Sequence, residues 1–153
     1  GIVPLWQDSL SRVSEENTDI AAESILLYAF SRLSDSGKKQ NGLISEIIEI
    51  TEDEFASSDL SVVSVADHLS YSPKYISSSF KRHFKIGISD YISTLRIQHA
   101  CTLMEQGFSS ISDISKQCGY ADPQYFSKIF KRFFLVYPSE YIKNGKMGVE
   151  ELK

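Results

Sequence analysis

The chain contains the stretch SPKYISSSFKRHF at residues 72–84 and, fifty positions later, the similar stretch DPQYFSKIFKRFF at residues 122–134. Between residues 73 and 92, ten of twenty residues are identical to their counterparts in the second copy. A buried helix requires only apolar residues at regular spacing, yet here polar and basic residues between them recur as well. The repeat therefore indicates two modules with one task.

Each copy has the pattern of a helix-turn-helix. Ser72 and Asp122 are good N-cap residues, and each precedes a proline at the first helical position. Apolar residues at helical spacing predict the inner faces of helices 73–84 and 123–134: Ile76, Phe80 and Phe84, then Phe126, Ile129, Phe130 and Phe133. A short helix and a tight turn precede each of them, and the second turn is one residue longer. The short helices carry the stripes Val62, Val65, Ala66 and Leu69, and Ile111, Ile114 and Cys118.

The remaining segments also favour helices, so the sequence predicts an all-α protein. We expect helices at 43–55, 89–107 and 138–143, with the long middle one joining the two modules and residues 144–153 as a tail. Residues 1–42 form an acidic segment with an expected helix from Thr18 to Leu33 that is apolar on more than one face. Such a helix needs partners on two sides, from the rest of the chain, a missing domain or a second copy. Because the chain begins with Gly rather than Met, we expect the natural protein to be longer.

Charge is distributed unevenly along the chain. The net charge is −4, but residues 1–59 hold 4 Lys and Arg against 12 Asp and Glu, whereas residues 60–143 hold 10 against 6. The basic charge therefore belongs to the repeated half. An anionic partner is favoured there, although the net charge of the whole chain argues against one.

Other classes of function find little support in the sequence. No apolar run is long enough to cross a membrane. Cys101 and Cys118 form no zinc-type or CxxC pattern, which indicates a reduced, cytoplasmic setting, and His68, His83 and His99 complete no ligand set. No Gly-rich phosphate loop, Ser/His/Asp set or carboxylate pair stands out. We therefore expect no enzyme, no catalytic residue, no metal and no cofactor.

The run GYADPQYFSKIFKRFFLVYPSEY (119–141), the first copy and the joining stretch YISTLRIQHACTLM (91–104) resemble the AraC/XylS family of bacterial transcription regulators. The match covers about residues 45–143 and depends on residues in a fixed order: Gly119, Tyr125, Phe126, Ser127, Phe130, Lys131, Pro138 and Tyr141. The resemblance implies a DNA-binding domain at 43–143, with seven helices in two subdomains joined by the long helix. Its helices 73–84 and 123–134 would enter adjacent major grooves of promoter DNA. RNA polymerase would be a further partner, and the N-terminal part would form a homodimer.

The resemblance also implies which residues contact DNA. The expected base contacts are Lys74, Ser77, Ser78, Gln124, Ser127 and Lys128, and the expected phosphate contacts are Lys81, Arg82, Lys131 and Arg132. Glutamine can pair with adenine through two hydrogen bonds and lysine can donate to guanine, whereas serine can serve base or phosphate. The alternatives are a solvated helix face for the lysines and surface ion pairs for Arg82 and Arg132. We expect Arg96 to pair with an acidic residue of the domain rather than with phosphate, and Tyr75 and Tyr125 to pack rather than contact bases.

The chain departs from the family pattern just after the helices 73–84 and 123–134. Lys85 and Leu135 stand where the family usually has Gly, and Gly87 and Tyr137 stand where it usually has Ser or Thr. We expect a left-handed helix end at Lys85 and Leu135 to be strained, because both residues carry a side chain.

Two hypotheses of different kinds follow. The first is a sequence-specific DNA-binding regulator of transcription, an activator or a repressor, whose operator and inducer the sequence does not identify. The second is a protein-interaction or dimerisation fragment, favoured by the acidic residues before position 60, whose DNA binding is weak without a missing N-terminal domain. A third, an enzyme that carries an incidental helix-turn-helix, has no residues to support it.

Overall fold

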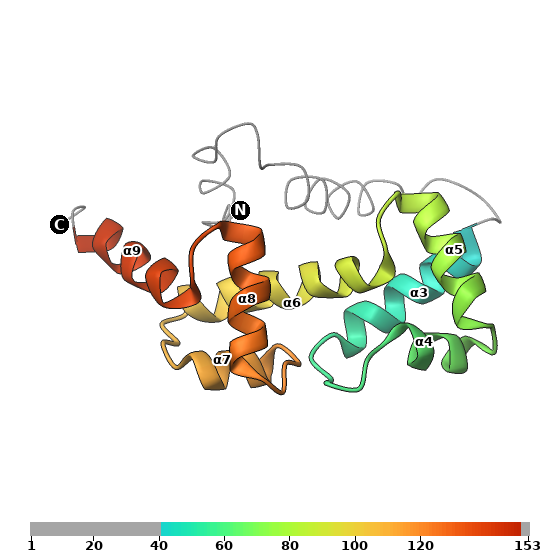
Figure 1. Ribbon diagram of the computed structural model, residues 1–153, viewed down its shortest axis with the longest axis horizontal. Coiled ribbons are helices and arrows are strands. Elements are labelled where there is room, and N and C mark those ends of the chain that lie inside the picture. Colours follow the sequence, from blue (N-terminus) through green and yellow to red (C-terminus); the bar gives the residue numbers. More distant parts are fainter. Residues whose placement is uncertain (1–40, 151–153) are drawn as a thin grey trace.

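The computed structural model describes residues 41–150, and in this range it contains seven helices and no strand. With the labels of Figure 1, they are α3 (Asn41–Glu54), α4 (Val62–Leu69), α5 (Pro73–Phe84), α6 (Ile88–Glu105), α7 (Ile111–Gln117), α8 (Pro123–Phe134) and α9 (Pro138–Glu150). The predicted all-α class is therefore confirmed for this part of the chain. The helix expected between Thr18 and Leu33 lies outside the described residues.

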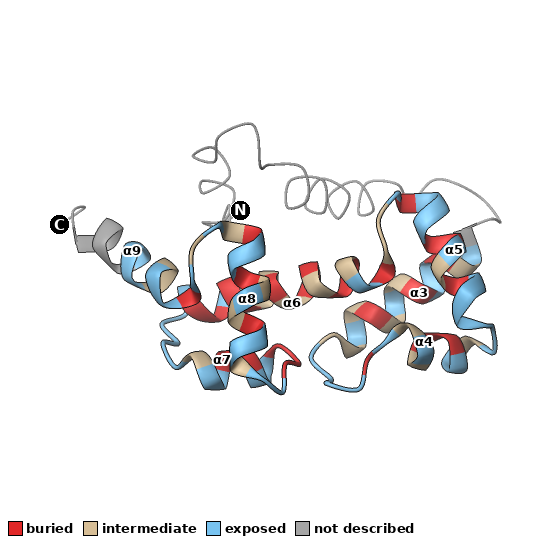
Figure 2. Ribbon diagram, in the orientation of Figure 1, coloured by how far each residue is buried: buried red, intermediate tan, exposed pale blue. Residues whose placement is uncertain are grey.

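The long helix α6 joins two groups of helices. Figure 1 shows α3, α4 and α5 gathered at one end of α6, and α7, α8 and α9 at the other. We call the first group, with residues 88–95 of α6, the first module, and the second group, with residues 97–105, the second module. Ten side chains of α6 are buried, and Figure 2 shows buried residues along its whole length. Because α6 packs on two sides, it has no single apolar stripe.

Each module has its own core, built from the predicted stripes. Ile76, Phe80 and Phe84 of α5 are buried in the first core, against Val65 and Ala66 of α4. In the second core, Phe126, Phe130 and Phe133 of α8 are buried against Ile114 and Cys118, and Ile129 is partly buried beside them. The two cores are thus copies of one arrangement, which explains why the apolar residues of the repeat recur.

The helix starts predicted from the sequence are confirmed. The Oγ of Ser72 accepts a hydrogen bond from the backbone N–H of Tyr75 at 3.2 Å, and Oδ1 of Asp122 accepts one from Gln124 at 2.9 Å. Pro73 and Pro123 occupy the first turns, where a missing N–H costs nothing. Cap and proline fix where α5 and α8 begin, and hence which residues their first turns present.

Both α5 and α8 end in a left-handed residue that is not glycine. Lys85 has φ 64° and Leu135 has φ 62°, and each backbone N–H returns to the carbonyl four residues earlier. The strain expected from the sequence is therefore built into both modules at equivalent positions. Gly87, which starts α6, provides no side-chain cap, whereas the backbone N–H of Tyr137 donates to Oε2 of Glu140 at 2.9 Å.

The last helix differs from the prediction. We expected it to end near Lys143, but α9 continues to Glu150, through part of the expected tail. Residues 144–150 contain no proline, and glycine weakens a helix without blocking it. Their composition therefore does not stop the helix.

Candidate nucleic-acid interface

The outward face of α5 carries the residues expected to contact DNA in the first module. Lys74, Ser78, Lys81 and Arg82 are exposed and Ser77 is partly exposed. Their spacing of three and four residues places them along one side of the helix, opposite the buried phenylalanines. The sequence prediction thus assigned these side chains to the correct face, and the face is polar and basic.

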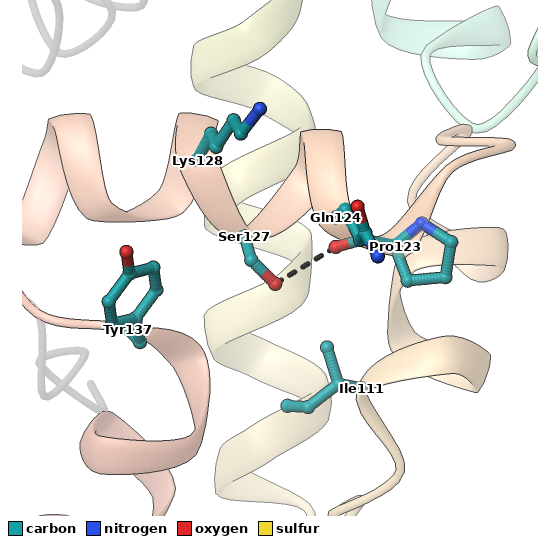
Figure 3. A pocket seen from close by; sticks show the side chains of 6 residues that line it. All are labelled: Ile111, Pro123, Gln124, Ser127, Lys128 and Tyr137. Atoms are coloured by element: carbon teal, nitrogen blue, oxygen red, sulfur yellow. Dashed lines mark hydrogen bonds between the residues drawn. The ribbon is translucent and has the colours of Figure 1, made fainter.

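The equivalent face of α8 borders a shallow hollow. Gln124, Ser127 and Lys128 line it together with Pro123, with Ile111 of α7 and with Tyr137 before α9, and its volume is about 330 Å³ (Figure 3). Gln124 and Lys128 are exposed, whereas Ser127 is partly buried and its Oγ donates to the carbonyl oxygen of Pro123 at 2.9 Å. The hydroxyl hydrogen of Ser127 is thereby used within the helix, so this side chain offers an outside group an acceptor.

The basic residues at the end of α8 contact side chains of two other segments. Nη2 of Arg132 lies 2.8 Å from Oδ1 of Asp90, in a half-exposed ion pair between α8 and the first turn of α6. This is the ion-pair alternative to phosphate contact. Nζ of Lys131 lies 4.2 Å from the centre of the Tyr137 ring, in cation–π geometry. Both side chains remain exposed to solvent.

Arg96 has a different partner from the one expected. Within residues 41–150, its guanidinium donates to backbone carbonyls rather than to a carboxylate. Its Nε donates to the carbonyl oxygen of Phe55 at 2.7 Å, and its Nη2 donates to that of Ser57 at 2.8 Å. These carbonyls lie just beyond the C-terminal end of α3, which carries partial negative charge, and that of Ser57 also accepts from the backbone N–H of Leu60 at 3.4 Å. A guanidinium satisfies both at once, which a sequence reading that searches for carboxylates does not anticipate.

The tyrosines at the start of α5 and α8 are more exposed than expected. Tyr75 and Tyr125, expected to pack, are 48% and 55% exposed. The Tyr75 ring stacks on Tyr71, also exposed, at 5.2 Å between ring centres, and Tyr125 meets Tyr120 edge to face at 6.1 Å. The packing prediction was thus wrong in part, because each ring has one neighbour and one open side. A repeated tyrosine in the first turn of both helices was the available signal.

Two buried thiols lie in the second core, and a partly buried histidine lies beside Phe55. Burial raises the pKa of Cys101 and of Cys118 to about 12, so both are protonated at neutral pH. Burial lowers the pKa of His99, whose ring lies 5.2 Å from that of Phe55. Within residues 41–150, no group of three His, Cys, Asp or Glu side chains is placed to hold a metal ion. No helix in the same part of the chain is long and apolar enough to span a membrane.

Comparison with known proteins identifies the family. A family model described as a helix-turn-helix domain matches residues 65–144, more than half of the chain. Among curated proteins, the chain is 29% identical over 106 residues to the uncharacterized HTH-type transcriptional regulator YijO of Escherichia coli K12, covering 69% of this chain and 37% of the relative. It is 33% identical over 104 residues to the uncharacterized transcriptional regulatory protein YesN of Bacillus subtilis 168, covering 66% of this chain and 28% of the relative. The chain therefore spans only about a third of these relatives.

A solved structure shows the same fold. The C-terminal domain of AraT, a response regulator from Geobacillus stearothermophilus, superposes with a TM-score of 0.66 at 27% identity, covering 70% of this chain and 88% of that one. The duplicated helix-turn-helix, the joining helix and the matched residues agree with the resemblance seen in the sequence. The chain belongs to the AraC/XylS family of helix-turn-helix transcription regulators.

Proposed function

We propose that this chain recognises a specific promoter sequence by placing α5 and α8 in adjacent major grooves on one side of DNA. The observation that carries the proposal is the repetition of exposed residues. Both helices start at a capped proline, bury an apolar side chain at two equivalent positions (Ile76 and Phe126, Phe80 and Phe130) and expose polar and basic residues at equivalent positions. Selection for a core alone does not require the exposed residues to recur. Two such helices read more base pairs than one helix can.

The two faces divide into base-reading and phosphate-binding parts. The base contacts we propose come from the first turns: Lys74, Ser77 and Ser78 of α5, and Gln124, Ser127 and Lys128 of α8. Gln124 offers both a donor and an acceptor to adenine, and the lysines donate to guanine. The hollow beside Gln124 and Ser127 has apolar walls in Ile111 and Pro123, which suit a thymine methyl group.

The phosphate contacts we propose come from the last turns. Lys81 and Arg82 of α5 and Lys131 and Arg132 of α8 place four positive charges along the two helices. Arg132 reaches a phosphate by exchanging Asp90 for it. A half-exposed pair of this kind is worth only about 0–1 kcal/mol, so the exchange costs little.

In its cellular role the domain would act in the cytoplasm, where it positions RNA polymerase at a promoter or blocks it. Dimerisation through a part of the protein before residue 41 would pair two such domains on DNA. Both statements extend the proposal to the longer protein that the relatives represent.

A salt series on the 153-residue chain tests the proposal. Binding to DNA from the protein's own promoter region is compared with binding to random DNA between 50 and 300 mM salt. Four phosphate contacts predict a slope of log K against log salt near −3.6, from about −0.9 per contact. We expect preference for one fragment with that slope. Equal, weak binding to all fragments would contradict a self-sufficient reader and favour the interaction-fragment alternative.

A further inference from the structure

The two modules contact each other beside their shared helix. The loop that follows α3 in the first module meets the turn between α7 and α8 in the second, and Figure 1 shows these two segments side by side. A Cβ added to Gly119 would lie only 2.7 Å from the carbonyl oxygen of Phe55 and 3.1 Å from the carbonyl carbon of Ala56. Gly119 also has φ +82°, a conformation that favours glycine. The contact between the two backbones therefore leaves no room for a side chain at position 119.

Arg96 lies at the centre of this contact. From the middle of α6 it donates to two carbonyl oxygens of the first-module loop, at 2.7 and 2.8 Å. Its guanidinium carbon lies 5.1 Å from the centre of the Tyr120 ring, which belongs to the second-module turn and is 5% exposed. The Nε of Arg96 would be 3.0 Å from a Cβ on Gly119. A single side chain of α6 thus contacts both the loop of the first module and the turn of the second.

These contacts are directional as well as close. Hydrogen bonds from an ionised donor are shorter and about twice as strong as neutral ones, and the planar guanidinium fixes the angle between its two acceptors. A helix alone resists bending less than a helix braced by a side contact. The Arg132–Asp90 pair also connects the modules, but both of its partners are half exposed, so it constrains their orientation less.

We infer that Arg96 is a positioning residue, which sets the relative orientation of the two modules and thereby the spacing of the two DNA subsites that the chain accepts. This inference rests on the proposed function for its DNA consequence, but the orientation of the modules is measurable without DNA. Arg96 contacts no base in this assignment. Its effect on recognition acts through the placement of α5 and α8.

The first experiment measures orientation directly. Nitroxide labels are attached at Asp67→Cys in α4 and Ser112→Cys in α7, both exposed positions, and the distance distribution is recorded by pulsed electron resonance. The unmodified chain, with only the buried Cys101 and Cys118, is the labelling control. We expect one narrow distribution, broadened or split by Arg96→Ala and by Gly119→Ala. An equally narrow distribution at the same distance in both variants would overturn the inference.

The second experiment measures spacing. A site is selected from random DNA by the unmodified chain, and one base pair is inserted between its halves, which rotates them by about 34°. We expect the insertion to weaken binding by the unmodified chain about tenfold or more, as losing one base contact does, and to weaken binding by Arg96→Ala less than about threefold. Arg96→Lys keeps the positive charge but loses the planar guanidinium that donates to two carbonyls at once. It should therefore not restore the preference for the original spacing of the two DNA halves.

A stability control separates positioning from folding. Ile47→Val, in the buried core of the first module and away from the contact, should lower the melting temperature while keeping the tenfold preference. Loss of the preference in Ile47→Val as well, or the same preference in Arg96→Ala, would overturn the role of Arg96 in spacing. Failure of the unmodified chain to select any site would refute the proposed function instead, and the label distances would then decide the orientation claim alone.

Discussion

The left-handed residues that end α5 and α8 give a stability prediction with a built-in control. At Lys85, φ is 64°, and the side chain is exposed, with one weak hydrogen bond from Nζ to the carbonyl oxygen of Arg82 at 3.2 Å. Replacing Lys85 removes that bond and a positive charge near the helix end, whatever the new residue is. Both losses are the same in Lys85→Gly and Lys85→Ala, so the difference in free energy of unfolding between these two variants reports the effect of the left-handed backbone conformation.

The magnitude follows from two opposing terms. A residue with a Cβ costs roughly 1–2 kcal/mol in the left-handed region. Glycine relieves that strain, but the unfolded chain gains about 0.4–1 kcal/mol of conformational freedom. Lys85→Gly should therefore have a free energy of unfolding about 0.5–1 kcal/mol higher than that of Lys85→Ala. For a folded region of this size the difference corresponds to roughly 2–6 °C in melting temperature.

The assay is urea and thermal unfolding of both variants, followed by far-ultraviolet circular dichroism. The same comparison at Leu135, where φ is 62°, should give a difference of the same sign, because the backbone is equivalent. A Gly variant that is no more stable than the Ala variant at both positions would refute the strain argument.

Three further predictions concern recognition and pH. Gln124→Ala should reduce discrimination between selected and random DNA by about 1–3 kcal/mol. The control Gln117→Ala, at an exposed position of α7, should leave that discrimination unchanged. Equal losses of affinity for selected and random DNA would refute a base contact at Gln124. Asp90→Asn should free Arg132 from its ion pair and strengthen DNA binding by up to about 1 kcal/mol, the most that a half-exposed pair is worth. Asp67→Asn, which makes the same charge change on α4, should strengthen binding less, and an equal gain in both variants would reduce the effect to net charge. Burial lowers the pKa of His99 from 6.5 in the folded chain. As the pH falls, the unfolded chain therefore binds a proton on this imidazole before the folded chain does. Stability should therefore fall as the pH drops below about 6.5 toward the folded-state pKa, and His99→Gln should flatten that fall in a pH series of thermal unfolding.

The repeat predicted most of the fold because capping and periodicity are local. Ser72, Asp122 and the two prolines mark helix starts by chemistry that acts within one turn, and the phenylalanines mark the buried faces by spacing alone. The two-sided burial of α6 was also foreseeable, since its apolar residues occupy more than one face. These features need no knowledge of distant contacts.

The contacts between modules were not predictable in the same way. Arg96 meets carbonyls about forty positions away, and Asp90 meets Arg132 across a similar distance in the chain. Backbone carbonyls are present at every residue, so no side-chain pattern distinguishes those of Phe55 and Ser57. The exposure of Tyr75 and Tyr125 was missed for a different reason, because aromatic residues are usually assigned to cores and the recurrence of this tyrosine in both helices was not given enough weight.

Hydroxyl-radical footprinting of the 153-residue chain on a site selected from random DNA tests the central claim most directly. If α5 and α8 enter adjacent major grooves, the protected positions should form two segments whose centres lie about 10–10.5 base pairs apart, on one side of the duplex. Alanine at Lys74 and Ser78 should weaken protection of one segment, and alanine at Gln124 and Lys128 that of the other. A single protected segment, lost equally with either pair of substitutions, would contradict recognition by two helices.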